Sequence, residues 1–543
     1  MVQMDKLVCR VHATAENARP FLVIVITLPV NLDRHRGPGL SRAHKGARHD
    51  GMAVAAGISH SVAVSEDGGL FVWGSGHKGK LGTGNTGSRQ TPARVTDLPA
   101  PVVQVAAGRG HTAIVTEDGH LLLCGAGDDG QLGLIDKADK TTPTLLGRAL
   151  FENDAVLMVD CGLVHTAALT EGGSVYTFGA GWLGQLGHGN RENEQEPRKL
   201  PAALFNNVRI VMLAAGFSHT VALSEVGHIF TWGSGILGRL GHGNEERQLA
   251  PRQVDPARFG GEKVTFVAAG GSHTVAVAAG GHLYSWGYGE YGRLGHGDTT
   301  NRLVPTLVPT AAFAGSAVVM AACGGLHTMV VTHDGSLRAC GHGGYGQLGM
   351  KCSCNRHVFE LVGSGEFGHA RIVTAAAGHY HSAAVTEDGA LWTWGYSGEG
   401  CLGHGDQHIR RTPTLVPAAD FGGGRIGRCR ALPEQYALAF AMGTHERLGA
   451  AADAHCSLLM PELVVKIARL GLVWPTGRAG EEEGLVRLLG GGAGAGAEMR
   501  RWPTWTVWPS ACPPLKASCL SYSRNTGMAD RYDSLSRLRY FFV

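Results

Sequence analysis

The stretch that decides the fold is residues 267–298, which read VAAGGSHTVAVAAGGHLYSWGYGEYGRLGHGD. It contains a Gly-x-x-His-[Thr/Ser] motif, a second glycine eleven residues after the first, and more glycines around a leucine. The pattern occurs seven times, and five of the six steps between its histidines are 54 residues long. A period of this length indicates a repeat architecture. The motif histidines are His60, His111, His165, His219, His273, His327 and His381.

Each repeat predicts short strands joined by tight turns. In the second copy, residues 111–116 and 121–125 are apolar runs separated by Glu-Asp-Gly, which is a hairpin signal. Residues 102–106 predict a third strand, and residues 92–95 a short fourth strand in which a proline suits a sheet edge. Four strands per unit of about 50 residues are typical of a propeller blade. The sequence therefore predicts an all-β fold, a seven-bladed β-propeller with four-stranded blades, over residues 51–430.

The two ends of the repeat region suggest how the ring closes. The last unit ends at residues 413–416, and no further Gly-x-x-His motif follows it. The first motif, in residues 52–67, stands before any complete unit. We expect these two segments to pair and so complete the seventh blade, because closure removes open sheet edges.

Composition narrows the partners that this chain can have. Its 48 basic and 45 acidic residues leave a net charge of +3, which offers no polybasic surface for nucleic acid or anionic lipid. No segment is apolar over the roughly 18 residues that a membrane helix needs. Several of the 12 cysteines occupy core columns of the repeat, where free thiols suit a reducing compartment. We expect a monomer in the cytoplasm or nucleus, with no direct nucleic-acid or membrane contact.

Two patterns that imitate cofactor sites are explained by the repeat. Gly74-Ser-Gly-His-Lys-Gly79 matches a dinucleotide fingerprint, but no helix or βαβ unit is expected after it. The seven motif histidines belong to separate blades and cannot converge on one metal ion. We therefore expect each of them to anchor a turn within its own blade. We expect the same of His188, His242, His296 and His404. No cofactor, metal or catalytic residue is predicted, and enzymatic activity is disfavoured.

The segments outside the repeats carry weaker signals. Residues 1–50 predict a disordered or targeting segment, residues 431–489 a short helical extension, and residues 490–543 a glycine-rich linker with a disordered tail. Residues 458–470 form an amphipathic pattern that resembles the first helix of an F-box. The alternative is a helix that packs its apolar face on the propeller.

The repeat resembles that of the regulator of chromosome condensation family, most clearly in LYSWGYGEYGRLGHGD at residues 283–298 and in Pro305. The resemblance implies a seven-bladed propeller and, for the exchange factors of that family, guanine-nucleotide exchange on a Ran-like small GTPase. Acidic residues between the Gly and the His of certain repeats accompany that activity. The seven pairs in this chain contain no carboxylate.

We interpret the chain as a non-catalytic scaffold for a protein partner, with a small GTPase as one candidate. The residues between Gly and His combine aromatic, apolar and Arg side chains, as binding surfaces do. Exchange on a Ran-like GTPase is an alternative, and substrate recognition for a ubiquitin ligase through residues 458–470 is another. The predicted partner-binding residues are Arg109, Leu163, Val164, Phe217, Leu326, His379 and Tyr380.

Overall fold

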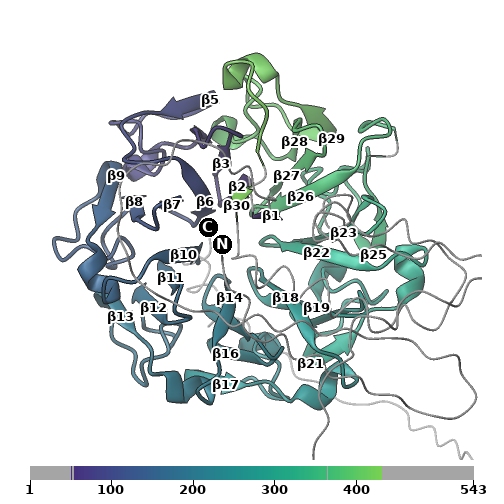
Figure 1. Cartoon of the computed structure of the whole chain (residues 1–543). Helices are drawn as coiled ribbons and strands as arrows, with labels where there is room; N and C mark the ends of the chain where they lie inside the picture. The colour runs from purple at the N-terminus through teal and green to yellow at the C-terminus, as the bar shows by residue number, and fades with distance from the viewer. Residues whose placement is uncertain (1–49, 52–53, 364, 428, 431–543) are drawn as a thin grey trace, which may run out of the picture. The chain divides into compact units, whose positions relative to one another are not determined.

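A computed structural model describes residues 50–51, 54–363, 365–427 and 429–430. Seven four-stranded antiparallel sheets surround a central axis (Figure 1), which confirms the predicted seven-bladed propeller. The segments 431–489 and 490–543, residues 1–49 and the F-box-like stretch 458–470 lie outside the described residues, so the predictions made for them stay predictions. None of the helices in the described part is long and apolar enough to cross a membrane.

Each blade consists of four consecutive strands. Blades one to four contain β2 (Val54–Ala56), β3 (His60–Val64), β4 (Leu70–Gly74) and β5 (Arg89–Val95); β6 (Val102–Ala107), β7 (His111–Thr116), β8 (Leu121–Gly125) and β9 (Lys140–Leu146); β10 (Val156–Cys161), β11 (His165–Thr170), β12 (Val175–Gly179) and β13 (Glu194–Lys199); and β14 (Ile210–Ala215), β15 (His219–Ser224), β16 (Ile229–Gly233) and β17 (Gln248–Gln253). Blades five to seven contain β18 (Val264–Ala269), β19 (His273–Ala278), β20 (Leu283–Gly287) and β21 (Arg302–Leu307); β22 (Val318–Cys323), β23 (His327–Thr332), β24 (Leu337–Gly341) and β25 (Arg356–Leu361); and β26 (Ile372–Ala377), β27 (His381–Thr386), β28 (Leu391–Gly395) and β29 (Arg410–Leu415).

Short 3-10 helices lie in the loops, and one pair of two-residue strands lies outside the blades. The helices are η1 (His77–Gly79), η2 (Arg148–Phe151), η3 (Ala202–Phe205), η4 (Ile236–Gly238), η5 (Pro256–Phe259), η6 (Glu290–Gly292), η7 (Thr310–Phe313), η8 (Gly398–Gly400) and η9 (Ala418–Phe421). The extra strands β1 (Asp50–Gly51) and β30 (Cys429–Arg430) pair with each other.

Burial explains the composition of each strand. The second strand of a blade, such as β19, is buried along its whole length because neighbouring blades cover both of its faces. Small and β-branched apolar residues fit such a doubly covered position. The fourth strand, such as β5, is exposed over much of its length and carries Pro92, whose missing N–H suits an outer edge.

The predicted pairing of residues 52–67 with residues 413–416 is wrong. Strands β2 and β3 pair with each other, and β3 pairs with β4 of the same blade. Strand β29 pairs with β28. The hairpin of residues 65–69 places β3 beside the strand that follows it, so the first Gly-x-x-His motif opens a complete blade and no half-blade remains.

The ring closes through the segment that follows blade seven. Ser65 forms a bridge with Ile426, and the Gly427 N–H donates to the Val64 carbonyl at 3.0 Å. Phe421 of η9 packs edge-to-face on Phe71 at 5.2 Å between ring centroids. The linker into blade three places Phe151 on Tyr176 in the same way, at 5.1 Å. Residues 416–427 therefore take the place of a linker into blade one, although no peptide connects them to it.

Candidate functional site

A belt of histidines joins all seven blades. Each motif histidine contacts, through Nε2 and at 2.8–3.0 Å, the hydroxyl that follows the histidine of the next blade. The last pair, His381 with Ser61, closes the belt between blades seven and one. The seven pairs are His60–Thr112, His111–Thr166, His165–Thr220, His219–Thr274, His273–Thr328, His327–Ser382 and His381–Ser61. The expectation that the imidazoles bond within their own blades is therefore wrong. Each motif histidine still closes its own turn, because its backbone carbonyl accepts from the N–H of the first motif glycine, as His60 does from Gly57 at 2.9 Å.

The hydrogen count sets the protonation state of the belt. Each hydroxyl donates its single proton to a backbone carbonyl, as Thr112 does to the Lys80 carbonyl at 2.7 Å. The same holds in the other six copies. The imidazole must therefore donate through Nε2, which requires a proton on that nitrogen. Burial disfavours a second proton on Nδ1, so the ring is the neutral Nε2–H tautomer. Burial lowers the pKa of His111 and His381 to about 4, and that of His165 and His327 to about 3.

The motif glycines make room for these imidazoles. A Cβ on Gly57 would lie 2.7 Å from His60 Cε1 and 2.5 Å from the Gly108 carbonyl oxygen. Both distances are shorter than real Cβ contacts allow, so a side chain here would displace either its own histidine or the next blade. The Gly-x-x-His spacing is thus a packing requirement of the ring.

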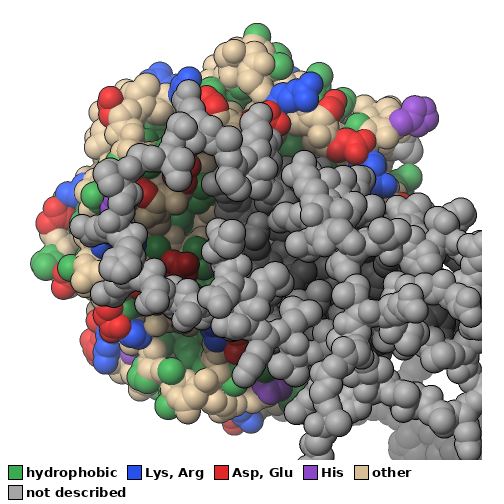
Figure 2. Space-filling model, in the orientation of Figure 1, with side chains coloured by type: hydrophobic (Ala, Val, Ile, Leu, Met, Phe, Trp, Pro, Cys, Tyr) green, Lys and Arg blue, Asp and Glu red, His purple; other side chains and the backbone are tan. Residues whose placement is uncertain are grey.

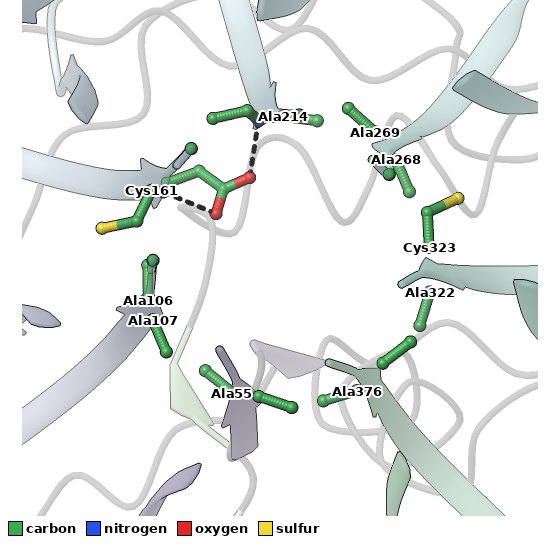
Figure 3. Close-up of a pocket in the computed structure, with 18 of the residues that line it drawn as sticks. Ala55, Ala106, Ala107, Cys161, Ala214, Ala268, Ala269, Ala322, Cys323 and Ala376 are labelled. Carbon is green, nitrogen blue, oxygen red and sulfur yellow. Dashed lines mark hydrogen bonds between the residues drawn. The ribbon is translucent and has the colours of Figure 1, made fainter. Parts of the chain in front are cut away.

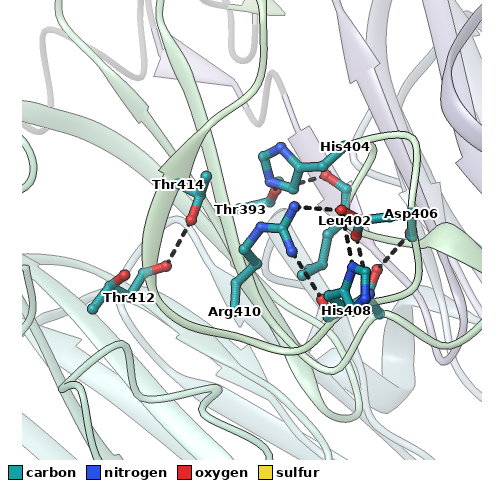
Figure 4. Close-up of polar contacts among 9 residues, drawn as sticks. Thr393, Leu402, His404, Asp406, His408, Arg410, Thr412 and Thr414 are labelled. Carbon is teal, nitrogen blue, oxygen red and sulfur yellow. Dashed lines mark hydrogen bonds and ion pairs between the residues drawn. The ribbon is translucent and has the colours of Figure 1, made fainter.

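A second set of histidines anchors loops inside the blades, as predicted. Thr393 Oγ1 donates to the Leu402 carbonyl at 2.6 Å and contacts His404 Nε2 at 2.9 Å (Figure 4). In the same loop, Asp406 accepts from Arg410 Nη2 at 2.8 Å. The equivalent pairs are Thr177–His188, Thr231–His242 and Ser285–His296.

The seven Gly-x-x-His turns share one face with the glycine-rich loops that follow the third strands. The Tyr396 N–H, for example, donates to the Tyr380 carbonyl at 2.9 Å, and the other six copies repeat this bond. We call this surface the Gly-x-x-His face. The loops begin at Gly74 and its equivalents and continue into a 3-10 turn or an open turn.

One residue column decides the shape of each glycine-rich loop. Where the residue before the loop leucine is Gln, as at Gln347, its Oε1 accepts from the backbone N–H two residues earlier, here that of Tyr345. Where it is Arg, as at Arg293, Nε donates to the Glu290 carbonyl instead, and Tyr291 adopts a left-handed φ of 62°. The same left-handed position recurs before Lys80, Arg239 and Cys401. A hydrogen-bond acceptor in the side chain before the loop leucine therefore allows the residue two positions earlier to avoid a left-handed φ.

The predicted partner-binding residues all lie at the Gly-x-x-His turns, with Arg109 exposed and the other six half-buried. Arg109 and Leu163 line the mouth of the axial cavity. Phe217, His379 and Tyr380 come together, as described next. Val164 and Leu326 accept loop N–H bonds through their carbonyls. The contacts made here do not test partner binding, which stays a prediction.

Two rings meet over the axis although they come from blades four and seven. Phe217 and His379 lie 5.5 Å apart between centroids. Glycines on the intervening blades make this possible: a Cβ on Gly325 would lie 1.9 Å from His379 Cδ2, and one on Gly271 would lie 3.1 Å from Phe217 Cε2. The missing side chains at these two positions let the two rings partly cover the axial opening.

These rings continue into an aromatic cluster over blades five to seven. Tyr345 lies 4.8 Å from Tyr380 and 5.4 Å from Tyr396, and His342 lies 4.7 Å from Tyr291. Tyr345 is 38% exposed and Tyr396 is 42% exposed. The aromatic cluster comprises Phe217, Tyr288, Tyr291, His342, Tyr345, His379, Tyr380 and Tyr396.

Five members of the cluster were not predicted: Tyr288, Tyr291, His342, Tyr345 and Tyr396. All five occupy the glycine-rich loops, whose glycines drew attention to a dinucleotide fingerprint. The signal that could have found them is a bias between copies. Copies five to seven each carry one or two aromatic residues at the variable loop positions, beside Glu290 and Glu399. Copies one and two carry His77, Lys78, Asp128 and Asp129 there.

Buried cations lie beneath this face. Arg293, only 1% exposed, donates through Nη1 to the Gly325 carbonyl at 3.1 Å and stacks on Tyr288 at 4.6 Å. Lys80 donates to Ser59 Oγ at 2.8 Å. Burial lowers the pKa of Arg293 to about 10 and that of Lys80 to about 8. Each cation ties a loop to a Gly-x-x-His turn, so the aromatic cluster rests on a hydrogen-bonded base.

The axis itself contains a cavity of about 200 Å³. Alanines from the first strands of six blades line it, and Asp160 and Cys161 take their place in blade three. Cys323 of blade six also lines the cavity, and the sulfur atoms of Cys161 and Cys323 point away from its centre (Figure 3). Asp160 is the carboxylate among the described lining residues. In the space-filling view, charged side chains lie along the visible outer rim, and both apolar and acidic side chains are visible in the hollow toward the axis (Figure 2).

The cysteines follow the predicted core pattern. Cys124 and Cys340 are buried in the column that elsewhere holds Trp73 and its equivalents, and the seven described cysteines are free thiols. Among the described residues, no three His, Cys, Asp or Glu side chains could together hold a metal ion.

Together, these features define a seven-bladed propeller of Gly-x-x-His repeats, closed without a shared blade. The chain belongs to the family with the RCC1-like domain: the family model matches residues 99–431, and models of the regulator of chromosome condensation (RCC1) repeat match residues 67–115 and 53–80.

Known relatives share this domain in different contexts. The Ultraviolet-B receptor UVR8 of Arabidopsis thaliana is 34% identical over 379 residues, which cover 68% of this chain and 83% of that protein. The human E3 ubiquitin-protein ligase HERC2 is 32% identical over 66% of this chain, but the match covers 7% of that protein. The structure of Kap60 bound to yeast RCC1 (Prp20) matches with a TM-score of 0.57 at 22% identity, over 72% of this chain and 91% of that one, and shows the fold alone.

Proposed function

We propose that this chain is a non-catalytic scaffold that binds a protein partner through the Gly-x-x-His face, with its strongest contacts at the aromatic cluster. The carrying observation is that seven rings from four blades form one continuous set of ring contacts, which is open to solvent at Tyr345 and Tyr396. Tyr288 joins this set through the Arg293 guanidinium, which lies over the rings of both Tyr288 and Tyr291. Tyrosines are enriched among the residues that dominate binding energy at protein interfaces.

Preorganisation supports the proposal. The rings of Tyr345, Tyr380 and Tyr396 contact one another at 4.8–6.3 Å, so their orientations are restricted before any partner arrives. A side chain that is already ordered loses less conformational entropy on binding. The face therefore combines large apolar area with hydroxyl groups at a low ordering cost.

The Gly-x-x-His face also differs in charge between its two halves, so a partner could bind it in one preferred orientation. In blades one and two the equivalent loops carry charged residues, among them Lys78, which forms an ion pair with Asp128. A partner that places apolar or aromatic groups over blades five to seven and polar groups over blades one and two would match both halves. Such an arrangement of anchor and polar rim is usual at protein interfaces.

The test is partner capture with the full-length chain and a double variant. Tyr345→Ala with Tyr396→Ala should reduce partner recovery strongly, because loss of interface anchors of this type costs about 2 kcal/mol each, or roughly 30-fold in Kd per residue. Val226→Ala is the matched control, since Val226 is 48% exposed on a hairpin of the opposite face. Equal recovery with the double variant and with the control would reject this face.

The same preparation separates the scaffold from the exchange alternative. A purified Ran-type GTPase loaded with a fluorescent nucleotide should show unchanged release when the chain is added. The pairs between Gly and His contain no carboxylate, so nothing on this face favours exchange. Accelerated release would replace the scaffold proposal by exchange. Substrate recognition through residues 458–470 depends on a segment outside the described residues, and loss of a co-purified ligase adaptor on its deletion would support it.

A further inference from the structure

The axial cavity has a largely apolar wall with a single carboxylate, that of Asp160, among its described lining residues. The first strands contribute paired alanines, for example Ala268 and Ala269 in blade five (Figure 3). Blade three departs from this pattern at Asp160, which lines the cavity. An alanine wall explains why the cavity exists, because larger residues at this radius would fill the axis.

Two backbone donors orient the Asp160 carboxylate. Oδ2 accepts from the Ala215 N–H of the next blade at 2.7 Å, and Oδ1 accepts from the Cys161 N–H at 2.8 Å. A carboxylate offers about four acceptor positions, so these bonds leave acceptor capacity on both oxygens. The Asp160 side chain is thus held in place and remains able to bind a donor.

No cation among the described residues pairs with Asp160. Burial raises its pKa to about 6, and only backbone N–H bonds counteract that rise. Gln104, on the neighbouring strand, uses its amide on Val105 and Val159 backbone groups. The carboxylate is half-buried, lines the cavity and has no counter-charge among the described residues, so a cation inside the cavity would form a favourable ion pair with it.

The chemistry of that cation follows from the wall. Divalent metals need several oxygen or nitrogen ligands, and the described residues offer no set of three that could bind one. An apolar wall instead favours a cation with an apolar body. A cavity of about 150 Å³ lined by aliphatic groups holds benzene, so about 200 Å³ admits a single-ring molecule.

We propose that the axial cavity binds a small organic ammonium ion, with the ammonium group on Asp160 and the apolar body against the alanine wall. The cavity is smaller than the 300–1,000 Å³ of pockets for drug-sized ligands. The site therefore selects amines with a body of about one ring. Phe217 and His379 of the aromatic cluster also line this cavity, but the ammonium site rests on Asp160 and does not depend on the scaffold proposal.

The other titratable groups of the described lining do not compete for this role. Burial raises the pKa of the Cys161 and Cys323 thiols, which stay neutral at physiological pH. His379, at the mouth, has its pKa lowered to about 4 by burial. Arg109 also lines the cavity. Between pH 5 and 7.5, Asp160 is therefore the lining group expected to change its charge.

The experiment measures binding of benzylamine to the full-length chain by calorimetry at pH 7.5, with neutral benzyl alcohol as the shape-matched probe. We expect benzylamine to bind at least tenfold more tightly than the alcohol. Asp160→Asn keeps the side-chain shape and an acceptor but removes the charge. It should lower benzylamine affinity about tenfold and leave the alcohol unchanged.

A pH series on the unmodified chain provides a second readout that does not depend on how the variant folds. With a pKa of about 6 for Asp160, benzylamine affinity should fall roughly twofold between pH 7.5 and 6.0, because half of the carboxylate is then protonated. Tryptophan fluorescence checks that the chain stays folded at each pH of the series. Absence of saturable benzylamine binding, equal affinity for amine and alcohol, or a pH-independent amine affinity would each overturn the proposal.

Discussion

Mild acid should unfold this propeller through the histidine belt. Each of the seven belt imidazoles is buried in the neutral Nε2–H form, and burial holds its pKa below the ordinary value of 6.5. The unfolded chain binds protons at that ordinary value, whereas the folded chain does not. The stabilisation is therefore complete above about pH 6.5 and is lost as the pH falls from there toward 4.

The size of the effect follows from proton linkage. At pH 5.5 an unfolded histidine carries about 0.9 proton and a belt histidine with a pKa near 4 carries almost none. Between pH 7.0 and 5.5 each histidine then removes about 1.3 kcal/mol, and seven remove about 9 kcal/mol. Asp160, whose pKa is raised to about 6, opposes this by about 1 kcal/mol. The loss is comparable with the whole stability of a typical domain, about 5–15 kcal/mol.

The assay is urea unfolding at several pH values between 7.0 and 5.5, followed by the fluorescence of the buried tryptophans Trp73, Trp232, Trp286 and Trp394. His219→Gln provides the control, because it should reduce the proton uptake on unfolding by one. A change of less than about 2 kcal/mol in the free energy of unfolding over this pH range, or an uptake below two protons, would refute the reasoning.

Three further substitutions test the packing of the ring. Gly325→Ala should destabilise the protein by about 1–3 kcal/mol, because the added methyl group overpacks the ring and displaces His379. Gly147→Ala is the control and should stabilise the protein by about 0.4–1 kcal/mol, because Gly147 has open space at its Cβ and a φ of −62°. Thermal unfolding compares the two variants, and similar shifts in Tm would contradict the clash at Gly325. Trp73→Phe removes the hydrogen bond from the indole to the Cys401 carbonyl at 2.8 Å, which helps to close the ring. Trp286 has no hydrogen-bond partner for Nε1, so in urea unfolding Trp73→Phe should cost about 1 kcal/mol more stability than Trp286→Phe. Equal losses of stability would argue against a contribution from this bond. Arg293→Gln should supply the hydrogen-bond acceptor that Gln347 supplies in blade six and so return Tyr291 to a negative φ. A crystal structure of the variant would show this change. A φ of Tyr291 still near 62° would disprove the role proposed for the residue before the loop leucine.

Ring closure here depends on side chains and on one appended segment. His381 with Ser61 and the Trp73 indole with the Cys401 carbonyl join blade seven to blade one. Residues 416–427 add Phe421 and the bridge at Ile426. Propellers whose blade is shared between the two chain ends close through backbone pairing. This chain reaches closure with seven complete blades because the same histidine–hydroxyl bond operates at every blade junction.

The number of blades, the strands and the core columns could be read from the residues alone. Hydrophobic runs, Asp-Gly turns and glycines with a 54-residue period are local signals, and local backbone preference determines them. Cys124 and Cys340 were placed in the core for the same reason, because their column holds tryptophan elsewhere. The four loop histidines, such as His404, were also placed correctly, since their hydroxyl partners lie only eleven residues away in the chain.

The contacts between blades could not be predicted from the sequence, because they join residues that lie about 55 positions apart or at opposite ends of the chain. The His60 imidazole bonds to Thr112 of the next blade, and Phe217 meets His379 across the axis. Residues 64–66 receive the closing segment, and no blade is shared between the chain ends. Each depends on the angle between blades, which arises only when seven sheets pack at once. The periodic sequence therefore specified the units and their count, while assembly around the axis created the belt, the aromatic cluster and the cavity that contains Asp160.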